Sequence, residues 1–252
     1  MLCFVIALKS KAVSKNWDVV SQLFEDSLRS AYHQIDPDFK IIAVCHETPQ
    51  LHHTYDNRVE IINVDFLPPP SVAATDLTMQ DKWKKIAVGM VRAREFRPDF
   101  VMLMDADDLV SCHLSQYVNA HKEANGWILK QGYRYRYGSR WIYLDDHFNC
   151  GTNAIVSSRL IQFPLNTSSE EISKCVVLTH GHTVIEQHLR ELGTPLEPLP
   201  FLGAVYTHSH GDNWTDTYIP PKNWYGIRHL LGGLRRTRPL THQVRDEFSI
   251  VV

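Results

Sequence analysis

The acidic run Asp105-Ala-Asp-Asp108 is the segment best suited to chemistry, because it directly follows the apolar run Phe100–Met104. Two carboxylates separated by one residue just past a strand can converge on one divalent cation. Mg²⁺ and Mn²⁺ prefer oxygen ligands and bridge readily to phosphates. A second copy of the pattern, Asp36-Pro-Asp38, lies in a turn-prone context and is predicted to be a turn. The copy at Asp105 is therefore predicted to hold a metal ion, with a solvated turn as the alternative.

Apolar runs alternate with amphipathic segments from the N-terminus to Asp105, and this pattern predicts the elements that position the aspartates. Four runs are predicted to be buried strands: Cys3–Leu8, Phe39–Cys45, Val59–Val64 and Phe100–Met104. Apolar residues at three- and four-residue steps predict helices over Trp17–Ala31 and from Asp81 to Val91. The alternation indicates the α/β class, with a mostly parallel sheet flanked by helices. Ligands of such sheets bind beyond the carboxyl ends of the strands.

The second half of the chain carries weaker signals. Leu114–Ala124 is predicted to be a short helix, and Trp127–Leu144 a hairpin that turns at Gly138-Ser139. Thr183-Val-Ile-Glu186 matches a capping box, which predicts the start of a helix that ends at Gly193. Pro200–Tyr206 is predicted to be the last strand.

Residues 213–252 are predicted to form a C-terminal extension or lid. Aromatic residues such as Trp214, Trp224 and Tyr225 suit stacking on a sugar. The basic cluster Arg235–Arg238 suits contact with a diphosphate or with an anionic membrane surface, and the alternative is a solvated helix face.

The composition excludes several classes of protein. The 252 residues are 44% hydrophobic and 21% charged, which is typical of a globular protein. The net charge of −2 gives no signal for nucleic-acid binding, and no apolar run is long enough to span a membrane. The N-terminus is apolar first and basic afterwards, the reverse of a secretory signal. Five scattered cysteines indicate buried thiols. We therefore expect a cytoplasmic protein, which the basic tail would bring to the inner face of the membrane.

The segment VMLMDADDLV resembles the Asp-x-Asp motif of GT-A-fold glycosyltransferases, particularly the family-2-like group. The similarity extends over residues 1–212. Cys150-Gly-Thr-Asn153 resembles a Gly-x-Asn stretch at the acceptor side of the pocket, and Leu189–His208 is similar to the end of the catalytic domain. The resemblance implies a GT-A-like domain over residues 1–212, followed by the extension 213–252. It also implies metal-dependent transfer of a sugar from a nucleotide-diphosphate donor, preferably UDP-linked, to a saccharide or lipid-linked acceptor.

The resemblance assigns roles to the residues around the motif. Asp105 would meet the ribose or the metal, Asp107 would ligate Mn²⁺ or Mg²⁺, and Asp108 would support the catalytic site. In many relatives a histidine after the last strand is another metal ligand. His208 is the first candidate for this ligand and His210 the second, with a polar loop histidine as the alternative for each.

In relatives the nucleotide base is recognised by the loops after the first two strands. This implies contacts from four residues: Ala7, Leu8, His46 and Glu47. Asp81 and Lys85 stand one helical turn apart and would reach the same nucleotide, with an exposed ion pair as the alternative.

The sequence departs from the pattern of inverting relatives at one place. These relatives carry a Glu-Asp pair before the last strand, whose Asp is the general base, and Gly181-His182 stands there instead. Three interpretations follow: His182 is the base, the enzyme retains configuration without such a base, or the protein binds nucleotide-sugar without transferring it. Asp145 and Asp146 are further candidates for the base. A nucleotidyltransferase is the other alternative, although the segment after the first strand lacks the glycines of that class.

Overall fold

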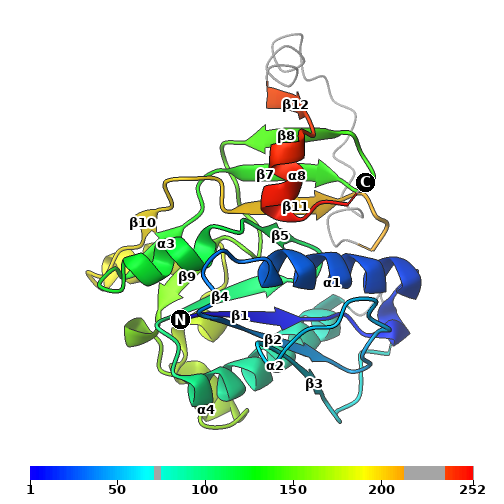
Figure 1. The fold of residues 1–252 in the computed structure, drawn as a ribbon. Coiled ribbons are helices and arrows are strands. Elements are labelled where there is room, and N and C mark those ends of the chain that lie inside the picture. Colours follow the sequence, from blue (N-terminus) through cyan, green and yellow to red (C-terminus); the bar gives the residue numbers. More distant parts are fainter. Residues whose placement is uncertain (71–74, 213–235, 252) are drawn as a thin grey trace, which may run out of the picture.

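The computed structural model describes residues 1–70, 75–212 and 236–251 (Figure 1). The strands are β1 Leu2–Ala7, β2 Phe39–Cys45, β3 Val59–Asn63, β4 Phe100–Asp105, β5 Leu109–Val110, β6 Gly126–Ile128, β7 Gly132–Arg136, β8 Trp141–Asp145, β9 Ala154–Ser157, β10 Glu197–Pro198, β11 Ala204–His208 and β12 Thr237–Pro239. The α-helices are α1 Trp17–Tyr32, α2 Thr75–Phe96, α3 Leu114–Ala120, α4 Ser169–Lys174, α5 Val176–Thr179, α6 Ile185–Glu191 and α8 His242–Phe248. The short 3-10 helices are η1 Lys11–Val13 and η2 Ser158–Leu160.

The larger sheet has the strand order β10-β6-β9-β4-β1-β2-β3. β1 pairs in parallel with β2 and β4, β2 pairs in parallel with β3, and β9 runs antiparallel to β4. The predicted mixed α/β class with a mostly parallel sheet is confirmed, and the four predicted strands are each within one residue of the observed bounds. The register places Ala7 beside Asp105, so the ends of β1 and β4 lie next to each other.

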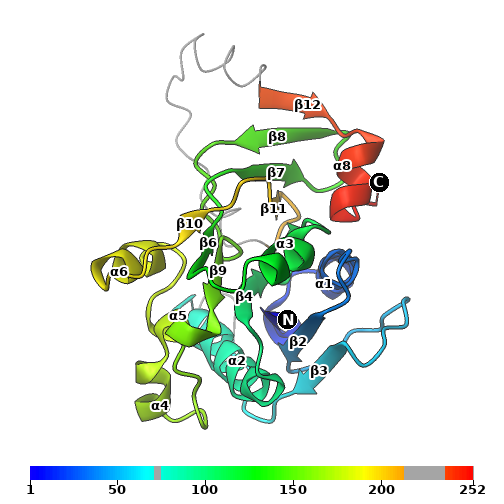
Figure 2. The same cartoon turned by 60° about the vertical axis from the view of Figure 1, so that its left-hand side comes forward.

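Helices cover both faces of this sheet (Figures 1 and 2). α1 and α3 pack on one face, and α1 buries the stripe Val20, Phe24 and Leu28 there. α2, α5 and α6 pack on the other face. α2 comes very close to the sheet at Gly89, where an added Cβ would lie 2.5 Å from a methyl group of Val5. α2 therefore packs closely on the sheet at this position.

A smaller sheet, in the order β12-β8-β7-β11-β5, packs against α8 (Figure 2). The predicted hairpin is formed by β7 and β8, with Gly138 at a positive φ of 76° in its turn. Tyr133 and Tyr135 are buried on its inner face. β5 follows the acidic run directly and pairs with β11, which brings the segment after β11 back beside the aspartates.

Two predicted helix starts are wrong. α2 already includes Thr75, so Asp81 lies inside it rather than at its start. α6 begins at Ile185, and the predicted capping box at Thr183 is not formed. The physical reason is that the Glu186 carboxylate pairs instead with Lys130 at 2.5 Å and with Arg190 at 2.6 Å.

The described part of the C-terminal segment, residues 236–251, contributes β12 to the smaller sheet. It also forms α8, which packs against that sheet. Trp214, Trp224, Tyr225 and Arg235 lie outside the described residues. All five cysteines are free and buried, as predicted. Among the residues that the structure describes, none of the helices has the length and apolar character needed to cross a bilayer.

Glu25 of α1 anchors the loop between β2 and β3. Its carboxylate accepts hydrogen bonds from the backbone N–H groups of His52, at 2.6 Å, and His53, at 2.8 Å. It also contacts the Nδ1 atoms of both rings, at 2.7 and 2.9 Å. Burial alone would raise the pKa of Glu25, but these hydrogen bonds outweigh it and lower the pKa to about 2.

This lowered pKa predicts a loss of stability in acid. The unfolded glutamate titrates near pH ~4.3, so the stability that Glu25 contributes is present above that pH and is lost as the pH falls towards 2. In urea unfolding at a series of pH values, we expect the free energy of unfolding to fall more steeply below pH ~4.3 in the wild type than in Glu25→Gln. Glu197→Gln, a change at an exposed glutamate, is the control. Parallel curves for the wild type and Glu25→Gln would contradict the assignment.

Candidate active site

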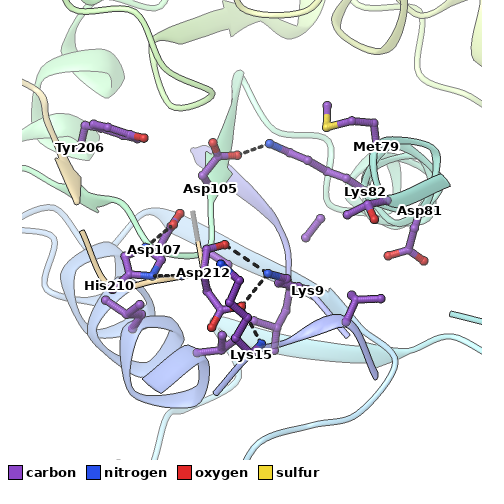
Figure 3. Close-up of a pocket in the computed structure, with 17 residues that line it drawn as sticks. Lys9, Lys15, Met79, Asp81, Lys82, Asp105, Asp107, Tyr206, His210 and Asp212 are labelled. Carbon is purple, nitrogen blue, oxygen red and sulfur yellow. Dashed lines mark hydrogen bonds and ion pairs between the residues drawn. The ribbon is translucent and has the colours of Figure 1, made fainter. Parts of the chain in front are cut away.

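A cavity of about 300 Å³ lies at the carboxyl ends of β1 and β4 (Figure 3). Its walls come from the ends of these strands and the loops that follow them, from α1 and α2, and from β11 and the segment after it. The polar and charged residues that line it are Lys9, Lys15, Thr78, Asp81, Lys82, Asp105, Asp107, Tyr206, His210 and Asp212. Parallel-sheet proteins bind their ligands at this place. We call it the donor cavity, after the nucleotide-sugar donor that the resemblance of the motif predicts.

The two aspartates of the predicted motif both line the donor cavity, and each contacts a cationic or polar partner (Figure 3). The Asp105 carboxylate pairs with Lys82 Nζ at 2.5 Å. The Asp107 carboxylate lies 3.0 Å from His210 Nε2. Burial alone would lower the pKa of Lys82, but the nearby carboxylates, first that of Asp105, outweigh it and raise the pKa.

Asp108 is completely buried beneath the loop and is not among the residues that line the cavity. Its carboxylate accepts a hydrogen bond of 2.6 Å from the Thr152 hydroxyl, which itself accepts one from the backbone N–H of Asp105 at 3.0 Å. Burial, with the charges of Asp107 and Asp105, raises the pKa of Asp108 well above its ordinary value. Asp108 is thus placed to position Asp105 through Thr152 rather than to touch a substrate.

Gly151 packs directly against the Asp105 carboxylate. An added Cβ would lie 2.3 Å from Asp105 Oδ2, so the carboxylate would have to shift from its position. The absence of a side chain at Gly151, the glycine of the Gly-x-Asn stretch, therefore leaves room for the Asp105 carboxylate.

We expect Gly151→Ala to weaken Mn²⁺-dependent UDP binding at least tenfold, because displaced ligands and their supports typically cost ~10–100-fold in metal affinity. The melting temperature should change little, because the change is at the rim of the sheet. The matched control is Gly181→Ala, whose Cβ would make an ordinary 3.6 Å contact with Trp83. Calorimetry that gives both variants the wild-type affinity would show that this close contact has no role in binding.

The two candidate histidines differ in their positions. His208 is the last residue of β11, is not among the residues that line the donor cavity, and stacks on Tyr206 with ring centroids 6.2 Å apart. His210 lies beyond the strand in a loop with positive φ at Ser209 and Gly211, which turns it towards Asp107. The structure therefore brings His210, the second candidate, to the aspartates and leaves His208 outside.

We expect His210→Ala to weaken Mn²⁺ binding in the presence of UDP by ~10–100-fold, a loss typical of damage to a metal site. His208→Ala is the matched control and should bind as the wild type does. Both titrations are read by calorimetry. The assignment is wrong if His208→Ala shows the loss and His210→Ala does not.

The donor atoms at this place fit a divalent cation that arrives with a diphosphate. Asp105 and Asp107 offer carboxylate oxygens, and His210 offers an imidazole, all of which Mn²⁺ accepts. Within the described ranges, no group of three or more His, Cys, Asp or Glu side chains gathers around one possible metal position. Mg²⁺ sites of this kind are typically completed by water and substrate phosphates, with only one or two carboxylates from the protein.

Asp81 and Lys85 form an ion pair at 2.6 Å, but the pair is buried and not exposed. Lys85 Nζ also donates to the carbonyl of Leu8 at 2.8 Å, and His46 Nε2 lies 2.7 Å from Asp81. Burial is the largest influence on Lys85 and lowers its pKa, although Asp81 opposes the shift. The group ties α2 to the ends of β1 and β2 and presents Asp81 to the donor cavity.

The four residues implied in base recognition divide into two pairs. Ala7 and Leu8 line the donor cavity. His46 lies behind Asp81, and the Glu47 carboxylate accepts hydrogen bonds from the Ser10 hydroxyl and the backbone N–H of Lys11. His46 and Glu47 thus hold the walls of the cavity and are not among the residues that line it.

Lys82 and Asp212 are site residues that the sequence analysis missed. The Asp212 carboxylate accepts hydrogen bonds from Lys9 Nζ at 2.7 Å and from the backbone N–H groups of Lys15 and Asn16. It therefore joins the segment after β11 to the loop after β1. An acid two residues beyond a candidate metal ligand was the available signal for Asp212, whereas Lys82 had only its position next to Asp81.

A second cavity, of about 220 Å³, adjoins the donor cavity, and Met79, Lys82 and Asp105 line both. His182 also lines this second cavity. Removal from water is the largest influence on His182 and lowers its pKa, while Asp105 opposes the shift and Lys82 adds to it. α6 starts at Ile185, three residues beyond His182.

Asp145 and Asp146, the other candidates for the base, lie at the end of β8 in the smaller sheet. Asp145 pairs with Arg134 at 2.5 Å, and Asp146 pairs with Arg236 at 2.5 Å. Neither is among the residues that line the two cavities.

No protein-family model matches the sequence, and no relative is found among the curated proteins. Among solved structures, S. aureus TarS 1–349 in complex with UDP-GlcNAc is similar over 92% of this chain and 65% of that chain, with a TM-score of 0.47 and 12% identity. A 4-diphosphocytidyl-2C-methyl-D-erythritol synthase from Anaerococcus prevotii is similar over 84% of this chain and 89% of that chain, with a TM-score of 0.43 and 12% identity.

Rv0371c from Mycobacterium tuberculosis, in complex with manganese, is similar over 86% of this chain and 95% of that chain, with a TM-score of 0.39 and 12% identity. In a longer TarS structure, the chain spans 37% of the matched protein. The strand order and pairing show a mixed α/β fold with a mostly parallel central sheet.

Proposed function

We propose that the protein is a metal-dependent glycosyltransferase that takes a sugar from a nucleotide-diphosphate donor, with UDP as the nucleotide. One observation carries the proposal: Asp105 and Asp107 line a cavity at the carboxyl ends of β1 and β4. Nucleotides typically bind at this position in parallel sheets. The resemblance of the motif to that of GT-A-fold enzymes supports the same assignment.

The charges of the donor cavity support the need for a divalent cation. Its lining holds three lysines, Lys9, Lys15 and Lys82, and four aspartates, Asp81, Asp105, Asp107 and Asp212. The formal net charge of these side chains is therefore −1, and a bound diphosphate would make the cavity more negative. Asp105, Asp107 and His210 would hold the cation, which when bound would neutralise the charge that develops on the leaving diphosphate.

The nucleotide base would lie between the ends of β1 and α2. Ala7 and Leu8 supply apolar surface there, and Asp81 presents a carboxylate that accepts from the N–H of a uracil ring. The ion pairs with Lys85 and His46 fix the position of this carboxylate before the ligand binds.

In the proposed transfer step, His182 accepts the proton of an acceptor hydroxyl. The hydroxyl oxygen forms a bond to the anomeric carbon, and the bond from that carbon to the diphosphate oxygen breaks. The electron pair of the broken bond leaves with the diphosphate, close to Lys82. The lowered pKa of His182 favours a neutral imidazole, which is the form able to accept a proton at neutral pH.

A donor panel tests the proposal. The protein is incubated with UDP-, GDP- and CDP-sugars and Mn²⁺, and release of the nucleoside diphosphate is followed by chromatography. We expect UDP release from at least one UDP-sugar and its loss on chelation with EDTA. Release of pyrophosphate from a nucleoside triphosphate and a sugar phosphate would indicate a nucleotidyltransferase instead. UDP binding without turnover on any donor would indicate a binding protein.

A further inference from the structure

The second cavity has two kinds of wall. Lys82, Asp105 and His182 form a polar part that adjoins the donor cavity. The rest is mainly apolar and includes Ile86, Val101, Leu103, Val156, Val177 and Ile185. The cavity therefore joins the place of the proposed transfer step to an apolar chamber.

The pleat of β4 accounts for this arrangement. Val101, Leu103 and Asp105 are two residues apart and so lie on the same face of the strand, the face that α2 covers. The strand rises ~3.3 Å per residue, so the apolar wall extends about 13 Å along β4 from Asp105 to Val101. On the neighbouring strand β9, Ala154 and Val156 continue the same face.

The cavity is large enough for a ring or a short alkyl chain. Its volume is about 220 Å³. An apolar cavity of ~150 Å³ in another protein stays dry and takes up benzene. Removal of apolar surface from water is favourable, so an apolar group that fills this cavity beside the charged residues would gain free energy.

Asn153 marks a polar contact inside this chamber. The side chain lines the cavity and is only 4% exposed. Its amide nitrogen donates to Asn149 Oδ1 at 3.3 Å and to the carbonyl of His182 at 3.4 Å. Its oxygen Oδ1 is buried and has no hydrogen-bond partner among the described residues. A buried acceptor of this kind is normally satisfied, so Asn153 Oδ1 is available to a donor group that enters the cavity.

We propose that the second cavity is the acceptor site and that it selects an alcohol carrying a compact apolar group, such as an aryl or short-alkyl group. The apolar group occupies the chamber, and the hydroxyl lies near Asp105 and His182. This inference rests on the proposed function for its description as an acceptor site. The binding of an apolar alcohol in the chamber does not depend on a donor.

The test uses p-nitrobenzyl alcohol as the probe, because nitroaromatic groups quench tryptophan fluorescence and Trp83 lines the cavity. The wild-type protein is titrated without nucleotide or metal. We expect saturable quenching, most of which disappears in Trp83→Phe. Glycerol, an alcohol without an apolar group, should compete at least tenfold more weakly, because even one methylene in an apolar pocket changes selectivity by ~10–200-fold.

Two variants locate the probe. Ala154→Leu fills part of the chamber and should weaken binding at least tenfold, and Val177→Ile should weaken it less, in the same direction. Ala124→Leu, at another partly buried alanine that is not among the lining residues, is the matched control and should bind as the wild type does. Absence of saturable quenching, or equal affinity of Ala154→Leu and Ala124→Leu, would overturn the inference.

Failure of this inference and failure of the proposed function give different results. If UDP and Mn²⁺ bind and the donor turns over while the probe does not bind, only the acceptor assignment is wrong. If the probe binds as expected and no nucleotide-sugar binds or reacts, the apolar site stands and the transferase proposal is wrong.

Discussion

Replacement of Asp107 by alanine is expected to abolish Mn²⁺-dependent UDP binding. The change removes one of two carboxylates that face the donor cavity and leaves His210 without its contact at 3.0 Å. A site that draws only one or two carboxylates from the protein has no substitute when one is lost. Asp107 is partly exposed in the loop after β4 and belongs to none of the buried apolar clusters. The fold should therefore survive, and calorimetry with Mn²⁺ and UDP measures the loss directly.

The matched control is Asp38→Ala, in the second Asp-x-Asp of the chain. Asp38 is half exposed and contacts the N-terminal amino group at 2.9 Å, at the opposite ends of the strands from the donor cavity. Its variant should bind Mn²⁺ and UDP like the wild type. Equal Mn²⁺–UDP affinity of the wild type and Asp107→Ala would remove the aspartate pair from the metal site.

The large sheet could be predicted because strands that are buried on both faces consist mainly of consecutive apolar residues. Phe39–Cys45 is entirely buried in β2, and its sequence contains one charged residue, Lys40. The same reasoning located Asp105 and Asp107, since acids that follow such a run must lie at the ligand-binding edge of the sheet. The apolar run predicts the strand, and the parallel pairing of β4 with β1 places the acids that follow it in the cavity.

The partners of these aspartates could not be predicted, because they depend on how distant segments pack. Lys82 of α2 pairs with Asp105 at the end of β4, and this contact depends on the packing of α2 against the sheet. The position of His210 beside Asp107 could not be predicted for a similar reason. His208 still belongs to β11, whereas the positive φ values of Ser209 and Gly211 redirect the chain towards Asp107. Single-residue turns of this kind leave little signal in the sequence.

Local signals were misleading where ion pairs across the fold compete with them. Thr183 and Glu186 have the spacing of a capping box, but Glu186 pairs with Lys130, far away in the sequence. Asp81 and Lys85 have the spacing of an exposed helical ion pair, but strand ends and His46 cover them. In both cases the tertiary partner decides, and residue spacing contains no information about it.

The Lys82–Asp105 ion pair lies where the two cavities meet. A donor diphosphate on one side and an acceptor hydroxyl on the other would both approach this pair. In the proposed transfer step, a group of the second cavity near this pair would accept the proton of the hydroxyl. His182 is the candidate for the proton acceptor, because it lines the second cavity and the charges of Asp105 and Lys82 both influence its pKa.

Replacement of His182 by alanine is expected to reduce turnover a hundredfold or more, because general bases contribute ~10²–10⁴-fold to rates. Donor binding should change little, since His182 is not among the residues that line the donor cavity. His188→Ala, on α6 and outside both linings, is the matched control.

The pH profile separates a base from a merely structural histidine. The pKa of His182 is lowered, so the neutral imidazole persists to below the ordinary value near 6.5, and wild-type activity should fall only as the pH drops through this lowered pKa. In His182→Ala this acidic decline should vanish, leaving a low rate that is flat in the same range. A retaining enzyme, which needs no such base, would keep most of its rate in the variant. An unchanged rate and an unchanged acidic decline would therefore exclude His182 from the transfer step and favour retention of configuration.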